Sequence, residues 1–121
     1  MSASSSELKW VDNHCHFEEN DEVALDLQEA ANKGVEKFIV VGTDLETSLK
    51  AKELSQIFPE KIFATAGIHP HEAIHGTHGI EALLSEGQIV AVGECGFDLR
   101  SFSPRRTRES IQRTNHLRTQ I

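Results

Sequence analysis

The stretch VDNHCH at residues 11–16 places two histidines on either side of one cysteine. We predict a strand over residues 8–15. In a strand, alternate side chains point to the same side, so His14 and His16 share one side with Asp12. Two neutral imidazoles at a strand end can chelate one divalent ion such as Zn²⁺, Mn²⁺ or Fe²⁺. We therefore predict His14 and His16 as metal ligands, with Cys15 on the opposite side and packed.

A second candidate ligand is Glu94 in GECGFD, residues 93–98. Glu94 is the only ionisable residue in the apolar run from Ile89 to Cys95. The alternation of side chains along a strand places it on the same side as Val90 and Val92. A carboxylate there can hold one metal ion or bridge two. Glycines on both sides of it allow the backbone to approach closely.

Histidines also follow the predicted strand at residues 61–67, in the segment GIHPHEA at residues 67–73. Pro70 stiffens this segment between His69 and His71. Histidine side chains in such a loop can hold a phosphate or another anion. We predict that His69 and His71 bind substrate, and that His75 and His78 are solvated.

Strand-like and helix-like segments alternate along the chain. Continuous apolar runs rich in β-branched residues indicate buried strands, and a 3.6-residue apolar spacing indicates helices. We predict a helix over 20–34 capped by Asn20, and one over 44–58 capped by Asp44 with Leu45 and Leu49 on its buried face. The remaining predicted elements are strands at 37–42, 61–67 and 88–94 and a short helix at 79–87.

This alternation is typical of parallel βαβ units with right-handed crossovers. Either an open doubly wound sheet or a β/α barrel is consistent with it. In both architectures the functional residues lie at the carboxyl ends of the strands. The polar motifs at 11–16, 67–73 and 93–98 all follow predicted strands, which favours one shared active site.

Composition limits the remaining possibilities. The chain has 121 residues, a net charge of −7 and 38% hydrophobic residues, which allows one domain with a small core. Two cysteines provide no disulfide framework, and the polar start MSASSSE is not a signal peptide. No apolar run is long enough to span a membrane. We expect a soluble protein of a reducing compartment, either cytoplasmic or nuclear.

With these motifs in hand, the chain resembles the TatD family of metal-dependent deoxyribonucleases. The resemblance rests on VDNHCH, VVGTDLETSLKAKEL, TAGIHPHEA and VAVGECGFDL in that order, and it covers roughly residues 9–104. It implies a (β/α)8 TIM-type barrel that cleaves DNA phosphodiesters with two divalent metals, reported as Mg²⁺ or Zn²⁺. The imidazole and carboxylate donors also suit Mn²⁺. By resemblance His14 and His16 hold one ion, Glu94 bridges both, and His69 lies near the substrate.

A complete barrel of this kind needs eight strands and about 250 residues. The four predicted strands imply its N-terminal half, about four βα units, over residues 8–104. The family's two further histidines and one aspartate come from later strands, so we expect at most three of its six metal ligands. A half barrel would leave its first and fourth strands as open edges, which a homodimer could pair to complete a barrel.

The two ends of the chain differ from this central unit. We expect residues 1–7 to be disordered and residues 105–121 to form a basic divergent tail. Residues 1–99 contain all six lysines and 18 of the 19 acidic residues, whereas 100–121 contain all six arginines and only Glu109. This abrupt change motivates the hypothesis of a frameshifted or alternatively spliced ending, which sequencing of the coding region would decide.

Three functional hypotheses follow. The first is a metal-dependent deoxyribonuclease, in which the two-metal mechanism activates a water and stabilises the leaving oxygen. The second is a catalytically inactive truncated product, favoured by the missing ligands. The third is another amidohydrolase-like metal-dependent hydrolase, such as a deaminase or lactonase, which substrate assays would distinguish from the first.

Overall fold

A computed structural model of the protein describes residues 8–99. Four parallel strands alternate with helices along this part of the chain, so the fold is α/β and consistent with half of a TIM-type barrel. The predicted ends at residues 1–7 and 105–121 lie outside the described residues. The elements, in chain order, are β1 (Trp10–Cys15), α1 (Val23–Asn32), β2 (Val35–Val41), α2 (Leu45–Ile57), β3 (Ile62–Ala66), the 3-10 helix η2 (Pro70–His75), α3 (Ile80–Leu84) and β4 (Ile89–Val92).

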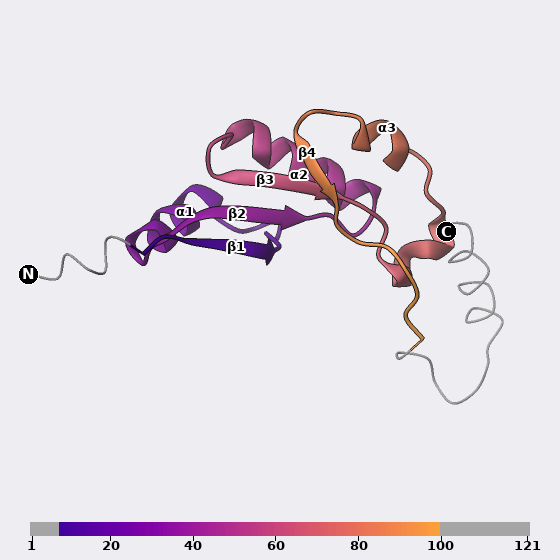
Figure 1. The fold of residues 1–121 in the computed structure, drawn as a ribbon, viewed down its shortest axis with the longest axis horizontal. Coiled ribbons are helices and arrows are strands. Elements are labelled where there is room, and N and C mark those ends of the chain that lie inside the picture. The colour runs from indigo at the N-terminus through magenta and orange to yellow at the C-terminus, as the bar shows by residue number, and fades with distance from the viewer. Residues whose placement is uncertain (1–7, 100–121) are drawn as a thin grey trace, which may run out of the picture.

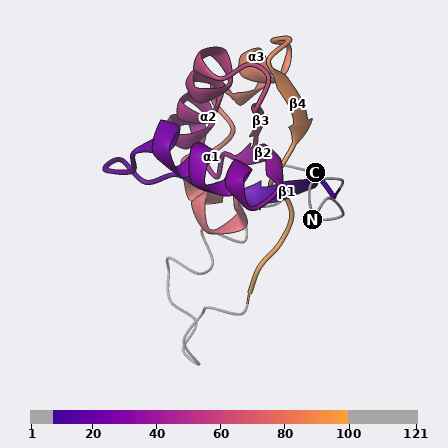
Figure 2. The ribbon, with the colours of Figure 1, turned by 90° about the vertical axis from the view of Figure 1, so that its left-hand side faces the viewer.

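The strands lie side by side in the order of the sequence, β1-β2-β3-β4. Successive right-handed crossovers between neighbouring parallel strands place every connecting helix on the same face of the sheet. Figure 1 shows this order, and Figure 2 shows α1, α2 and α3 together on one side of the strands. As predicted, β1 and β4 are the two edges of the sheet.

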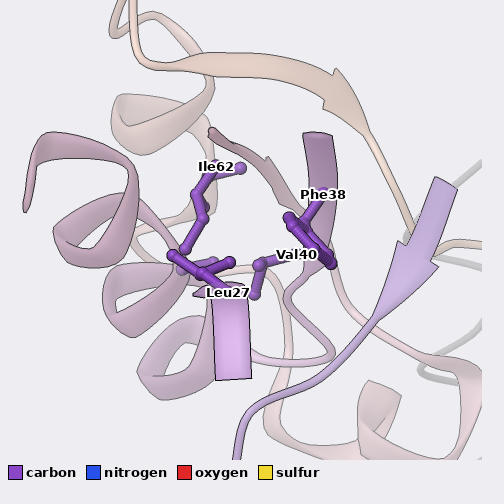
Figure 3. Close-up of a cluster of buried hydrophobic side chains, with 6 residues drawn as sticks. Leu27, Phe38, Val40 and Ile62 are labelled. Carbon is purple, nitrogen blue, oxygen red and sulfur yellow. The ribbon is translucent and has the colours of Figure 1, made fainter. Parts of the chain in front are cut away.

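The core lies between this sheet and the helices. Side chains from α1, β2, α2 and β3 form one buried cluster, in which four larger residues interdigitate (Figure 3). These are Leu27, Phe38, Val40 and Ile62, each no more than 6% exposed. Four of the six cluster residues belong to β2 and β3, the two central strands of the sheet, so the loops that follow these strands begin at the packed core.

Helix α2 begins where predicted, but a different face of it is buried. Asp44 Oδ1 accepts a hydrogen bond from Thr47 N at 2.8 Å, and the Thr47 hydroxyl accepts from Asp44 N at 3.0 Å, which forms a capping box. The prediction that Leu49 is buried is wrong, since Leu49 is 46% exposed. Small residues face the sheet instead, and Ser48 and Ala51 are almost completely buried. A Cβ on Gly42 would collide with Ser48, so the helix packs too close to the sheet for a leucine there.

Other elements also differ from the predictions, and α3 is shorter than the helix predicted over 79–87. Helix α1 begins at Val23 rather than after Asn20, because Asp21 Oδ2 accepts from Glu18 N at 2.6 Å and closes a turn in the preceding segment. The predicted loop after β3 contains the 3-10 helix η2. Gly34 follows α1 at a φ of 93°, a left-handed conformation that glycine adopts readily at the end of a helix.

Within residues 8–99, no helix is long and apolar enough to cross a membrane.

Candidate active site

The two histidines of VDNHCH lie at the carboxyl end of β1, as predicted. Their ring centroids are 5.1 Å apart and the rings are nearly perpendicular. Strict alternation does not extend through this strand, because its pairing with β2 shifts register between Asp12 and Cys15. Asp12 Oδ1 accepts a hydrogen bond from His14 N at 3.1 Å. The Asp12 carboxylate is therefore engaged with the backbone of its own strand.

The His16 ring is held by the neighbouring strand. Its Nδ1 lies 2.9 Å from the carbonyl oxygen of Val41, at the end of β2. A carbonyl oxygen can only accept, so Nδ1 carries the proton and donates, and in the neutral ring Nε2 keeps its lone pair. A metal-binding histidine characteristically donates its other ring N–H to a carbonyl or carboxylate in this way. His16 is thus in a tautomer that leaves Nε2 able to bind a metal ion.

Open space adjoins the same ring. A pocket of about 290 Å³ lies between the β1–α1 loop, the end of β2 and α2, and His16, Thr43 and Lys50 contribute to its wall. His16 is therefore accessible to a small ligand from the side of α2.

Glu94 lies two residues beyond β4, on the opposite edge of the sheet from His14. Its Oε1 is nevertheless 3.9 Å from His14 Nε2, and its side chain is only 20% exposed. Strands one and four of a flat sheet would be separated by about 14 Å, three times the strand spacing. The contact therefore indicates a sheet that curves at its carboxyl end, as the wall of a barrel does.

The backbone of Glu94 is fixed by the end of β3. Ile68 N donates to Glu94 O at 3.1 Å. A Cβ on Gly67 would lie 2.5 Å from the same oxygen and 2.7 Å from Glu94 N, closer than real Cβ atoms come. Glycine at position 67 is therefore what permits the β4 segment to approach β3 at the level of the candidate site.

The histidine loop, residues 69–75, follows β3. His69 is the N-cap of η2, and its Nδ1 accepts from His71 N at 3.1 Å. The two rings are 4.7 Å apart between centroids, at 73° to each other. His71 Nε2 lies 3.2 Å from Asp98 Oδ2. His75 is 74% exposed and lies 3.6 Å from Glu72, as expected for a solvated side chain.

Asp98 is the site residue that sequence reasoning missed. It is the last residue of the motif GECGFD, and its side chain is only 8% exposed. The signal in the sequence was an acidic residue at the end of a largely apolar segment. Glu94 lies in the same motif and was selected as the candidate instead of Asp98. Only the folded chain shows that Asp98 meets the histidine loop.

Cys15 packs against the core cluster, as predicted, and its Sγ lies 3.5 Å from Ile39 O. Burial, with a smaller contribution from the Asp12 carboxylate, raises the pKa of the Cys15 thiol from 9.0 to about 11. The thiol is thus protonated at neutral pH. Because the thiolate is the form that binds metals, Cys15 is a poor ligand there.

No three His, Cys, Asp or Glu side chains within residues 8–99 gather closely enough to form a metal-binding cluster. The structure does bring His14 Nε2 to 3.9 Å from Glu94 Oε1, and the His16 ring contacts the ring of His14. The donor types, two imidazoles and one carboxylate, are those of known divalent-metal sites.

Comparison with known proteins places this chain in a family. The family model described as TatD related DNase matches residues 11–121, so the chain belongs to the TatD-related DNase family. That match includes residues 105–121, for which a divergent tail was predicted and of which the structure describes nothing.

Curated relatives carry the name 3'-5' ssDNA/RNA exonuclease TatD. The Edwardsiella piscicida protein is 42% identical over 79 residues, which cover 61% of this chain and 30% of the relative. The Rahnella sp. (strain Y9602) protein is 35% identical over 83 residues, covering 64% of this chain and 32% of the relative. The chain thus spans about a third of the length of the relatives it matches.

Proposed function

We propose that this protein is a metal-dependent nuclease that hydrolyses phosphodiester bonds of DNA. The observation that carries the proposal is the 3.9 Å approach of His14 and Glu94 from opposite edges of the sheet. No local sequence pattern requires His14 and Glu94 to lie close together. Binding of one cation by both side chains is a physical reason for a histidine and a carboxylate to be neighbours. Family membership and the names of the relatives, which include single-stranded DNA and RNA as substrates, support the same reading.

In this proposal His14, His16 and Glu94 would hold divalent metal, and Glu94 would be the ligand shared by two ions. Mg²⁺, Zn²⁺ and Mn²⁺ are the candidates, and the two imidazole donors suit Zn²⁺ or Mn²⁺ better than the oxygen-preferring Mg²⁺. When bound, such ions lower the pKa of an attacking water and stabilise charge on the leaving oxygen. His69 and His71 hold the phosphate in place.

In this proposal the net charge gives the metal a role in binding DNA as well as in cleavage. At −7 the chain repels a polyanion by bulk electrostatics. Among the described residues that line the pocket beside His16, Lys50 is the one lysine or arginine. Divalent ions at His14, His16 and Glu94 would convert this local potential to one that attracts phosphate.

The test is cleavage of end-labelled single-stranded DNA by the purified full chain with Mg²⁺, Mn²⁺ or Zn²⁺. We expect cleavage that EDTA stops and that the added metal restores. His14→Ala should lose cleavage, whereas His75→Ala, which removes an exposed histidine, should keep it. Equal cleavage by both variants would identify a contaminating nuclease, and no cleavage with any metal would leave a chain that is inactive on DNA. RNA and small amide or lactone substrates, assayed in parallel, would then separate the alternatives.

We further propose that two copies pair through their open edges. The edge strands expose large apolar side chains, with Trp10, Val11, Val90 and Val92 each more than half exposed. Unpaired edges with apolar side chains favour strand addition by another chain.

Light scattering after size-exclusion chromatography tests this pairing. The full chain should elute with about twice its mass of 13.5 kDa. Val90→Lys should shift it to the monomer, because a lysine on an edge strand opposes pairing. A monomeric parent chain at micromolar concentration would contradict the proposal.

A further inference from the structure

We propose that Asp98 is a positioning residue that fixes His71 and thereby holds His69 as the tautomer whose Nε2–H faces substrate. The inference deepens the proposed function and rests on it for the identity of the substrate. The tautomer itself is a property of the folded chain and can be measured without any activity.

The first link joins Asp98 to His71. The distance from Asp98 Oδ2 to His71 Nε2 is 3.2 Å, and the two side chains are 8% and 35% exposed. A carboxylate with so little exposure must be compensated by donors, because burying an uncompensated charge is costly. The Nε2–H of His71 is one such donor, so the His71 ring is directed towards the segment that follows β4.

The second link joins His71 to His69. The backbone N–H of His71 donates to His69 Nδ1 at 3.1 Å. A ring nitrogen that accepts a hydrogen bond carries no proton, so the neutral His69 ring has its proton on Nε2. The perpendicular packing of the two rings, 4.7 Å apart, makes their orientations interdependent.

The backbone of His69 is anchored independently. His69 N donates to Thr43 O at 2.7 Å, which ties the loop to the end of β2. The loop therefore cannot turn as a rigid unit to compensate for a displaced His71. No group within residues 8–99 accepts a hydrogen bond from His69 Nε2. That N–H is left as a donor for an anionic oxygen, which is what a phosphodiester presents.

The experiment is a long-range ¹H–¹⁵N correlation spectrum of the histidine rings in the full chain near neutral pH. In the parent chain His69 should be the Nε2–H tautomer. Asp98→Ala should convert His69 to a mixture of tautomers, and Asp98→Asn, whose amide oxygen can still accept from His71, should largely restore the single tautomer. Glu72→Gln is the matched control, since it removes an acid–histidine pair of the same loop, and it should leave His69 unchanged.

Two results would overturn the proposal. One is a His69 that carries its proton on Nδ1 in the parent chain, a result that needs no variant to fold. The other is an Asp98→Ala chain that is folded by its amide spectrum and keeps the parent tautomer.

An activity measurement separates this inference from the proposed function. If the chain cleaves DNA, Asp98→Ala should raise KM about tenfold, the size expected from one charge-assisted hydrogen bond, with a smaller change in kcat. A KM equal to that of the parent would contradict the positioning role. If no variant cleaves DNA, the proposed function fails, and the tautomer spectrum still decides the role of Asp98.

Discussion

Glutamine in place of Glu94 should lower the affinity of the full chain for Mn²⁺ by at least about a hundredfold. Removing a residue that only hydrogen-bonds to a metal ligand already lowers metal affinity by about 10- to 100-fold, and Glu94 is proposed as a ligand itself. The substitution keeps the shape of the side chain and removes its negative charge. The remaining donors, His14 and His16, are neutral when they bind metal. The carboxylate is thus the one group of this set that offsets the charge of the ion. Isothermal titration of the metal-free chain with Mn²⁺ measures the effect.

Glu72→Gln is the matched control for that titration. Glu72 is also an acid beside a histidine, 3.6 Å from His75, but its side chain is 40% exposed, against 20% for Glu94. We expect its Mn²⁺ affinity to equal that of the parent chain. Equal affinities for the parent and Glu94→Gln chains would exclude Glu94 as a ligand, whatever the nuclease assay shows.

Alanine in place of Gly67 should destabilise the protein by about 3 kcal/mol, the upper range for overpacking a well-packed site. The added Cβ would lie 2.5 Å from Glu94 O and 2.7 Å from Glu94 N. Both are backbone atoms, which cannot rotate away as a side chain can. The strand ends must separate, and the hydrogen bond from Ile68 N to Glu94 O is weakened with them. Denaturant unfolding of the full chain, followed by circular dichroism, measures the change.

Gly87→Ala provides the comparison, because a Cβ at position 87 meets no atom within 4 Å. Its free energy of unfolding should stay within about 0.5 kcal/mol of the parent value, as for most surface substitutions. Gly67→Ala should also bind Mn²⁺ more weakly, since it displaces Glu94, and Gly87→Ala should not. Similar stabilities for the two variants would show that β3 and β4 can separate without cost.

Much of the fold follows from local pattern. The runs at 37–42 and 61–67 predicted β2 and β3 to within two residues, because a strand covered by helices and neighbours must be apolar along its length. Prediction was poorer where a segment depends on its neighbours. The buried face of α2 was assigned to Leu49, and only the close approach of that helix to β2 places Ser48 and Ala51 there instead.

The candidate site divides in the same way. His14, His16, His69, His71 and Glu94 were predicted from the rule that function lies at the carboxyl ends of parallel strands, a consequence of chain direction alone. That rule names which residues share one end of the sheet. It does not say how far apart they are, and their roles as ligands and substrate contacts stay predictions.

The sequence by itself determined the order of elements, the end of the sheet that carries the polar motifs, and the family. Each of these depends on residue type and spacing along the chain. The tertiary structure decided which residues touch. Curvature of the sheet brings Glu94 to His14 across four strands, and packing of the β4 segment brings Asp98 to His71. Such contacts join residues 80 and 27 positions apart, and they depend on the summed twist and packing of everything between them, which no local pattern encodes.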